Sequence, residues 1–191
     1  MSRAADDERA VLLLGDPRLR VVSSEVAAFD SDLTTSCSAL GATLEAFRKR
    51  HGFGRAISAP QVGIPRRIIA VNLGRGLFFI VNPRITAQSA STFTMWDDCM
   101  SFPDLLVRLA RHESISIEYE DETGRPHDWI DLDPAASELL QHEIDHLDGI
   151  LAVDRALDRD ALLLKAQFES DRASYRSVVD YTIGEGLRTD G

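Results

Sequence analysis

The feature that most constrains this chain is the string His142-Glu143-Ile144-Asp145-His146. The two histidines stand four positions apart, so an α-helix places both imidazoles on one face, one turn apart. In that arrangement the imidazoles can bind one metal ion, and Glu143 can reach a nearby water without binding the ion itself. Such a set can activate water at neutral pH and move its proton. The string therefore indicates a metal-dependent hydrolytic site on a helix.

Residues 133–149 have the pattern of a buried helix. Asp133 is a suitable N-cap before Pro134 at the first helical position, and Gly149 suits a left-handed C-terminal cap. Apolar residues recur through the segment at helical spacing: Leu139, Leu140, Ile144 and Leu147. The same string on a solvated helix would be a chance match, but buried histidines and acids need partners. The apolar surroundings favour the metal site.

Composition limits the other possibilities. A chain of 191 residues with 44% hydrophobic residues is large enough for one domain with a core, so we expect a single catalytic domain over residues 1–191. The net charge of −10 argues against nucleic acid or an anionic membrane as the main partner. The acidic, charged start resembles neither a signal peptide nor a transit sequence, and no apolar run is long enough for a membrane span. We therefore expect a cytoplasmic protein.

Strand patterns occupy the middle of the chain, and helix patterns lie on both sides. Residues 1–10 are expected to be loose. We expect strands at 67–72, 77–82, 114–120 and 125–132, and helices at 31–50, 133–149 and 158–181. This order predicts an α+β fold in which mixed or antiparallel β-sheets surround a central metal-binding helix.

A catalytic site of the zinc type has three protein ligands, so His142 and His146 need a third. Cys99 lies in a turn-like segment, and a thiolate is a strong ligand for a divalent ion. Cys37 instead belongs to a helical apolar stripe and is expected in the core. The other candidates are His51, His112, His127 and a downstream acid such as Asp154. Cys99 fits best among them.

Two further motifs precede the histidine string. Residues 54–61 read Gly-Arg-Ala-Ile-Ser-Ala-Pro-Gln, and residues 97–101 read Asp-Asp-Cys-Met-Ser. With the histidine string, they resemble the motifs Gly-x-Gly-Leu-Ala-Ala-Pro-Gln, Glu-Gly-Cys-Leu-Ser and His-Glu-x-x-His of the peptide deformylases. The order and spacing agree over roughly residues 11–165. The chain thus resembles a divergent member of that family and is expected to share its fold.

The resemblance implies an activity and a cofactor. Peptide deformylases are metal-dependent amide hydrolases that remove the formyl group from N-formylmethionine of newly made proteins, so N-formyl peptides and nascent chains are the implied partners. The implied cofactor is one divalent ion, iron(II) first, with zinc, nickel or cobalt as replacements. Its implied ligands are Cys99, His142 and His146. The sequence leaves the native metal, the oligomeric state and a housekeeping or accessory role open.

The resemblance also implies roles for residues around the metal. Glu143 would take a proton from water and give it to the leaving amine. The side-chain amide of Gln61 and the backbone N–H of Met100 would stabilise the oxyanion. The substrate would be bordered by Ala56, Ile57 and Phe102.

Four positions depart from the family motifs. Ala56 replaces a glycine, and Ser58 replaces an alanine and adds a hydroxyl that needs a partner. Asp97 replaces a glutamate, and Asp98 replaces a glycine. We therefore expect metal chemistry to be retained while the substrate stays open. Two alternatives remain: an amidase of the same fold acting on another small N-acyl compound, and a catalytically silent binding protein. An apolar pocket of methionine size would favour the deformylase.

Overall fold

The histidine helix forms where the sequence predicts it. The computed structural model describes residues 8–184, 186 and 187, and within them helix α2 spans Pro134–Leu147. The Asp133 side chain accepts a hydrogen bond from the backbone N–H of Ala136, which caps the first turn. Gly149 has φ +72°, and a Cβ there would lie 2.6 Å from the carbonyl oxygen of Arg20. Glycine therefore allows the chain to turn away at the end of the helix.

Helix α1 (Ser31–His51) packs on the first sheet and confirms the predicted first helix. Asp30 caps its start, and Gly52 ends it with φ +76°. One stripe of the helix faces the core: Leu33, Cys37, Leu40, Leu44 and Phe47. Burial raises the pKa of the Cys37 thiol to about 12. Cys37 is a core residue, as predicted.

The first sheet has five antiparallel strands in the order β1-β2-β3-β6-β7. Four of its strands lie where the sequence predicts strands, and hairpins around residues 74–76 and 121–124 join them in two pairs. The strands are β1 (Ala56–Ser58), β2 (Ile68–Asn72), β3 (Leu77–Gln88), β6 (Ile115–Glu120) and β7 (Pro126–Trp129).

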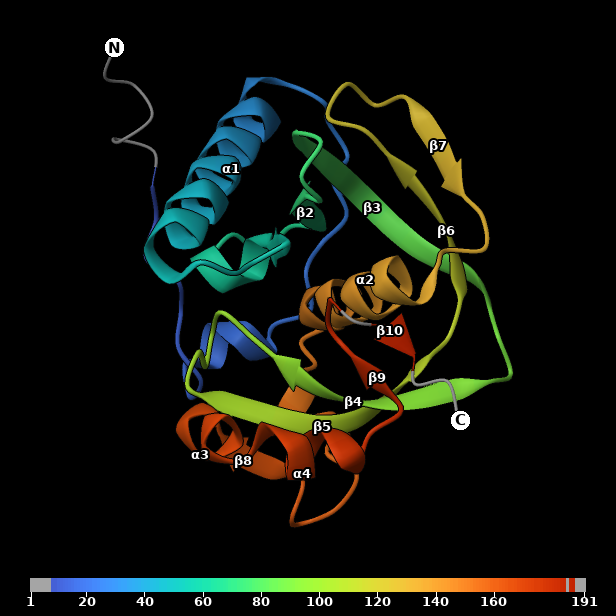
Figure 1. Ribbon diagram of the computed structural model, residues 1–191. Coiled ribbons are helices and arrows are strands. Elements are labelled where there is room, and N and C mark those ends of the chain that lie inside the picture. The colour runs from blue at the N-terminus through green and yellow to red at the C-terminus, as the bar shows by residue number, and fades with distance from the viewer. Residues whose placement is uncertain (1–7, 185, 188–191) are drawn as a thin grey trace.

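The second sheet contains three antiparallel strands in the order β4-β5-β8. These are β4 (Thr92–Asp98), β5 (Leu105–His112) and β8 (Leu162–Leu164). Helix α2 lies between the two sheets and contacts β1 on one side and β5 on the other (Figure 1). This central helix and the antiparallel pairing confirm the predicted α+β fold.

The expected single helix over residues 158–181 is wrong. The segment first forms β8, because Leu162–Leu164 pairs with Leu105–Val107 of β5. Asp171, with φ −151°, then interrupts the helical backbone, and its side chain accepts a hydrogen bond from the backbone N–H of Ser174. Two short helices result, followed by a small hairpin: α3 (Lys165–Ser170), α4 (Arg172–Ser177), β9 (Tyr181–Thr182) and β10 (Gly186–Leu187).

The expected loose N-terminus falls largely on residues 1–7, which lie outside the described residues. Residues 8–10 are held against α1: the backbone N–H of Arg9 donates to Thr43 Oγ1 at 2.9 Å, and Glu8 pairs with Arg50 at 2.6 Å. Further on, the backbone N–H of Leu12 donates to the carbonyl of Gln61. The N-terminal segment therefore supports the motif of residues 54–61. None of the helices in the described part has the length and apolar character needed to cross a membrane.

Candidate metal centre and active site

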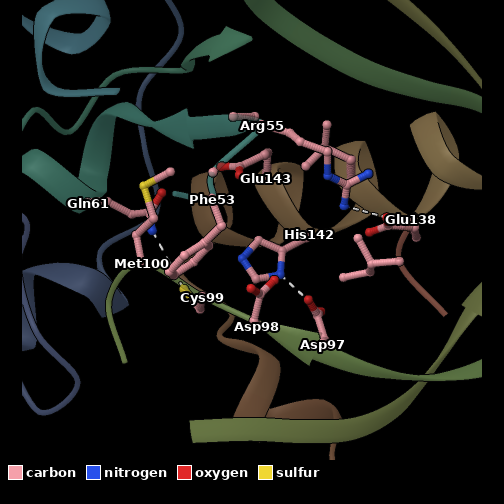
Figure 2. A pocket seen from close by; sticks show the side chains of 14 residues that line it. Phe53, Arg55, Gln61, Asp97, Asp98, Cys99, Met100, Glu138, His142 and Glu143 are labelled. Carbon is pink, nitrogen blue, oxygen red and sulfur yellow. Dashed lines mark hydrogen bonds and ion pairs between the residues drawn. The ribbon is translucent and has the colours of Figure 1, made fainter. Parts of the chain in front are cut away.

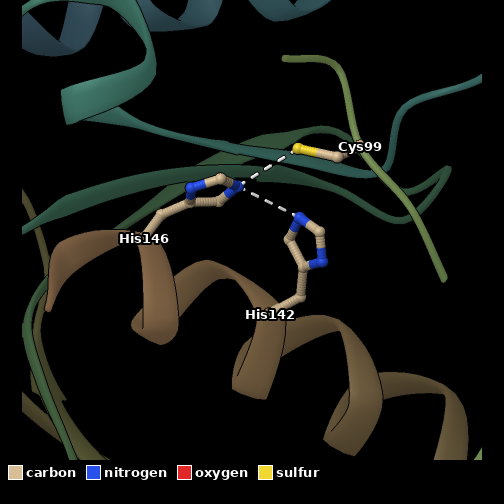
Figure 3. Close-up of side chains that lie close together, drawn as sticks. All are labelled: Cys99, His142 and His146. Carbon is tan, nitrogen blue, oxygen red and sulfur yellow. Dashed lines mark hydrogen bonds between the residues drawn. The ribbon is translucent and has the colours of Figure 1, made fainter. Parts of the chain in front are cut away.

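Three buried side chains converge on one point beside α2. The Cys99 Sγ and a ring nitrogen from each of His142 and His146 all lie within 4.8 Å of one another. The two Nε2 atoms are 3.1 Å apart, and Cys99 Sγ is 3.3 Å from His146 Nε2 (Figure 3). The helix supplies both histidines at one-turn spacing, and the turn after β4 supplies the cysteine. Cys99, which precedes His142 by 43 positions in the sequence, thus meets both histidines in one cluster.

The chemistry of this donor set fits a divalent ion. His142 Nδ1 is 2.9 Å from Asp97 Oδ2, which assigns the ring hydrogen to Nδ1 and leaves the Nε2 lone pair facing the cluster. Two imidazole nitrogens and a sulfur that face each other in the interior repel unless a proton or a cation lies between them. One thiolate and two imidazoles are also ligands that zinc-type and iron sites accept.

The other candidate ligands do not join this cluster. Each contacts a different part of the fold: His51 stacks on Phe47, His112 Nδ1 is 2.7 Å from the Ser89 carbonyl, His127 contacts Asp121, and Asp154 pairs with Arg20.

Asp97 connects the cluster to an ion-pair network. Its Oδ2 contacts His142 and also accepts from an Arg111 guanidinium nitrogen at 3.0 Å. Arg111 in turn donates to Asp145 at 2.5 Å, and Asp145 also accepts from Arg155. Burial alone would raise the pKa of Asp97, but His142 and Arg111 outweigh burial and hold that pKa below its usual range. The aspartate therefore still orients His142, although it is shorter than the glutamate of the family motif.

Glu143 has a partner that the family motif lacks. The Ser58 hydroxyl oxygen is 2.5 Å from Glu143 Oε2 and 2.8 Å from the Glu143 backbone carbonyl. The hydroxyl that Ser58 adds relative to the family motif thus has a hydrogen-bond partner in Glu143, the expected general base. Burial raises the pKa of the Glu143 carboxyl group. A buried carboxylate next to the metal cluster is suited to exchange a proton.

Gln61 is fixed in one orientation. Its Oε1 accepts a hydrogen bond from the Ser58 backbone N–H at 2.9 Å, so its Nε2 faces Cys99 Sγ at 3.6 Å and Ser101 Oγ at 3.2 Å. The Gln61 amide nitrogen is therefore directed toward Cys99 (Figure 2). Donors fixed in advance are what a developing oxyanion needs.

A cavity of about 170 Å³ lies beside the cluster. Of the residues expected beside substrate, Ala56 lines this cavity, but Ile57 and Phe102 do not. Successive side chains in a strand point to opposite faces, so Ala56 and Ser58 of β1 face α2 while Ile57 packs under α1. Phe102 packs into the core cluster of the second sheet. Met100, expected as a backbone donor, borders the cavity.

Sequence reasoning missed part of the cavity wall. Arg55 Nη2 lies 2.5 Å from Glu138 Oε1, and Arg55 Nη1 donates to the Ala135 carbonyl at 3.0 Å. Asp98 lines the same cavity. Glu138 stands four positions before His142, so helical spacing could have placed it on the histidine face. Nothing in its neighbourhood along the chain indicates the pairing with Arg55.

Comparison with known proteins agrees with this geometry. The sequence profile of the polypeptide deformylase family matches residues 8–161. The peptide deformylase of Thermotoga petrophila is 32% identical over 155 residues, which make up 81% of this chain and 91% of that protein. The peptide deformylase of Treponema pallidum is 36% identical over 143 residues, or 74% of this chain and 84% of that protein.

Solved structures agree as well. The crystal structure of peptide deformylase from Thermotoga maritima superposes with a TM-score of 0.72 at 30% identity, covering 79% of this chain and 99% of that one. The peptide deformylase from Synechococcus elongatus in complex with actinonin gives a TM-score of 0.74 at 28% identity, covering 89% of each chain. The profile match, the relatives and the shared fold lead to one conclusion: this chain belongs to the polypeptide deformylase family.

Proposed function

We propose that this protein is a metal-dependent hydrolase that removes the formyl group from N-formylmethionyl peptides of newly made proteins. One observation carries the proposal: in a chain of this family, Cys99, His142 and His146 converge beside Glu143 and Gln61. We also propose a cytoplasmic location, where nascent chains are made. The net charge of −10 supports a partner other than nucleic acid.

Each residue of the candidate site has its own role in the proposed reaction. A divalent ion held by the cluster would supply Lewis-acid polarisation and make water reactive near neutral pH. Glu143 takes the proton of the attacking water and delivers it to the amine nitrogen as the C–N bond breaks, which yields formate and a free amine. Ser58 holds the Glu143 carboxylate in position. The Gln61 amide and the Met100 backbone N–H stabilise the negative charge on the formyl oxygen.

The decisive assay uses enzyme loaded with nickel and matched formyl-Met and acetyl-Met peptides. Formyl carries only hydrogen on its carbonyl carbon and fits a small cavity, so we expect kcat/KM for formyl to exceed that for acetyl by about 100-fold, the cost of a misplacement near 1 Å. Glu143→Ala should retain its metal and lose about 10²–10⁴-fold in kcat. Comparable formyl and acetyl values would favour the alternative amidase. No activity with the metal site fully loaded would favour the binding protein.

We propose iron(II) as the native metal, with zinc, nickel or cobalt as functional replacements. Thiolate-bound iron(II) is open to oxidation, and Cys99 itself can be oxidised in air. Anaerobically prepared iron enzyme should therefore lose activity in air while nickel enzyme keeps it. Equal lifetimes of the two forms would argue against iron.

A further inference from the structure

A second cavity lies beside the metal cavity, between the second sheet and the C-terminal segment of residues 165–183. Helices α3 and α4 of this segment cover the face of the sheet that is turned away from α2 (Figure 1). The second cavity has a volume of about 180 Å³. Its apolar lining comes from both the sheet and the C-terminal segment: Trp96, Leu106, Phe168, Val179, Tyr181 and Ile183.

Hydrogen bonds and ring contacts hold the walls of the second cavity in place. The indole N–H of Trp96 donates to the backbone carbonyl of Tyr175 at 2.8 Å, and the Phe168 ring stacks on the Tyr175 ring. The Asp180 carboxylate accepts hydrogen bonds from the backbone N–H and the hydroxyl of Thr94, which fixes the C-terminal segment to β4. The cavity is therefore formed without a ligand, as binding sites for small molecules and peptides commonly are.

The charged side chains that line the second cavity carry an excess of positive charge. Three are cationic and two are acidic: Lys165, Arg172 and Arg176, against Asp98 and Glu169. Arg172 and Glu169 form an ion pair with each other. One positive charge remains when both acids are ionised, so an anionic group that enters this cavity balances its charge.

Lys165 is the cation of this lining that is best placed to receive an anion. Its side chain is half-buried, and its ammonium lies over the Phe53 ring, 4.2 Å from the ring centroid. Within residues 8–184, 186 and 187, no carboxylate lies within ion-pair distance of this ammonium. The ring occupies one side of the ammonium, and N–H donors on the other side remain available for a carboxylate.

The second cavity adjoins the metal cavity. Asp98 and Ile183 line both of them, and the Phe53 ring under the Lys165 ammonium lines the metal cavity (Figure 2). A peptide whose formyl group lies at the metal cluster has to continue out of the metal cavity. The shared wall leads it toward Lys165.

The cavity beside the N-terminal segment is a poorer continuation. It shares only Met100 with the metal cavity. The Met100 side chain lies directly against the backbone of Gly54, since a Cβ at that glycine would be 2.5 Å from Met100 Cε. This side chain stands between the two cavities, so the peptide continues toward the second cavity instead.

We propose that the second cavity binds the residues that follow methionine in a formyl peptide and favours an acidic side chain there. Lys165 is then a specificity-determining residue, because a substrate carboxylate gives its ammonium a charge-assisted hydrogen bond. The proposal rests on the proposed deformylase function and extends substrate recognition beyond the formyl-methionine end.

The test compares formyl-Met tripeptide amides that carry glutamate, glutamine or lysine at the second or the third position. Glutamate and glutamine have the same size, so the glutamate-to-glutamine ratio of kcat/KM isolates the charge, and the C-terminal amide removes the terminal carboxylate. At pH 7.5 with nickel-loaded enzyme we expect a ratio of about fivefold at one of the two positions, the range of a partly exposed ion pair. The net charge of −10 would by itself favour the lysine peptide, which is the opposite result.

Variants assign the preference to Lys165. Lys165→Met keeps the length of the side chain and removes its charge, so the glutamate-to-glutamine ratio should fall to about 1. In Lys165→Glu, kcat/KM for the lysine peptide should exceed that for the glutamate peptide. Lys49→Met removes an exposed ammonium from α1 and should leave the ratio of the wild type unchanged. A glutamate preference that persists in Lys165→Met would overturn the proposal.

Binding separates failure of this subsite from failure of the deformylase function. The same peptides are titrated by calorimetry into the nickel-loaded Glu143→Ala variant, which needs no turnover. Tighter binding of the glutamate peptide than of the glutamine peptide, with no hydrolysis by the wild type, would support the subsite and refute the deformylase. Equal binding of the two peptides with efficient hydrolysis of both would overturn the subsite and leave the deformylase intact. Equal binding with no hydrolysis would refute both.

Discussion

The Ser58 hydroxyl lies 2.5 Å from the carboxylate of Glu143, the proposed general base. The Ser58 hydroxyl reaches two oxygens of the same residue, one on the side chain and one on the backbone. This geometry restricts rotation of the Glu143 carboxylate relative to the axis of α2. The family motif has alanine at this position, so the hydroxyl adds a constraint that the reaction itself does not require.

Replacing Ser58 by alanine should therefore slow the reaction without abolishing it. A lost hydrogen bond to a charged group costs about 1.5–3 kcal/mol, and we expect only part of this in the barrier, a decrease in kcat of about tenfold. KM and metal content should not change. Ser24→Ala removes an exposed hydroxyl that donates to the Pro65 carbonyl, and it serves as the control. A change confined to KM would mean that Ser58 binds substrate instead.

Glu138 should make stability depend on pH. Burial raises its pKa from 4.5 to about 7 in the folded protein, although Arg55 opposes the shift. The folded state then binds more protons than the unfolded state between these values, so this group stabilises the fold below about pH 4.5, and its contribution is lost as pH rises through about 7. The full effect is on the order of 3 kcal/mol. Urea unfolding from pH 5 to 8 should show a steeper decline for wild type than for Glu138→Gln; parallel curves would contradict this.

At the level of elements, Arg111 holds β5 against α2. It reaches Asp97 at the end of β4 and Asp145 on α2, and all three side chains are buried. The metal ligands stand on the same elements, because Cys99 follows β4 and both histidines lie on α2. The ion-pair network therefore fixes the separation between the ligands before any metal binds.

Arg111→Met should be strongly destabilising because buried Asp97 and Asp145 lose the guanidinium that they share, which leaves Asp97 with His142 and Asp145 with Arg155. Removing one member of a buried ion pair costs about 3–5 kcal/mol. Arg108→Met, on the same strand, breaks a pair with the more exposed Asp158 and should cost under about 1 kcal/mol. Urea denaturation of the metal-free variants measures both values. Similar losses for the two would show that Arg111 contributes no more than a surface pair.

For the molecule as a whole, a bound metal should act as a cross-link between the second sheet and α2. A ligand present at 100 times its dissociation constant stabilises by about 2.7 kcal/mol, which corresponds to a Tm increase of roughly 5–10 °C for a chain of this size. Adding zinc to the stripped wild type should produce this increase, and a chelator should reverse it. Cys99→Ala should show neither change. An undiminished metal response in that variant would refute the ligand assignment.

Local signals made part of this molecule predictable. Capping residues and apolar spacing specified α2, and strand patterns in the sequence specified β2 and β3. The segment after residue 158 was different, because its leucines suit a helix as well as a strand, and pairing with β5 decided the outcome. Ile57 and Phe102 do not line the cavity, because strand alternation and turn direction are not visible in a motif match. The Arg55–Glu138 pair depends on contact between β1 and α2, which no local pattern reports.

Ile183 belongs to the small C-terminal hairpin, yet it borders both the metal cavity and the neighbouring cavity that contains Lys165. The family match ends at residue 161. Part of the cavity wall therefore comes from a stretch outside the family match, whereas the ligand-bearing motifs lie inside it. Two relatives with the same metal ligands but different residues at this point would therefore differ in the wall of the cavity.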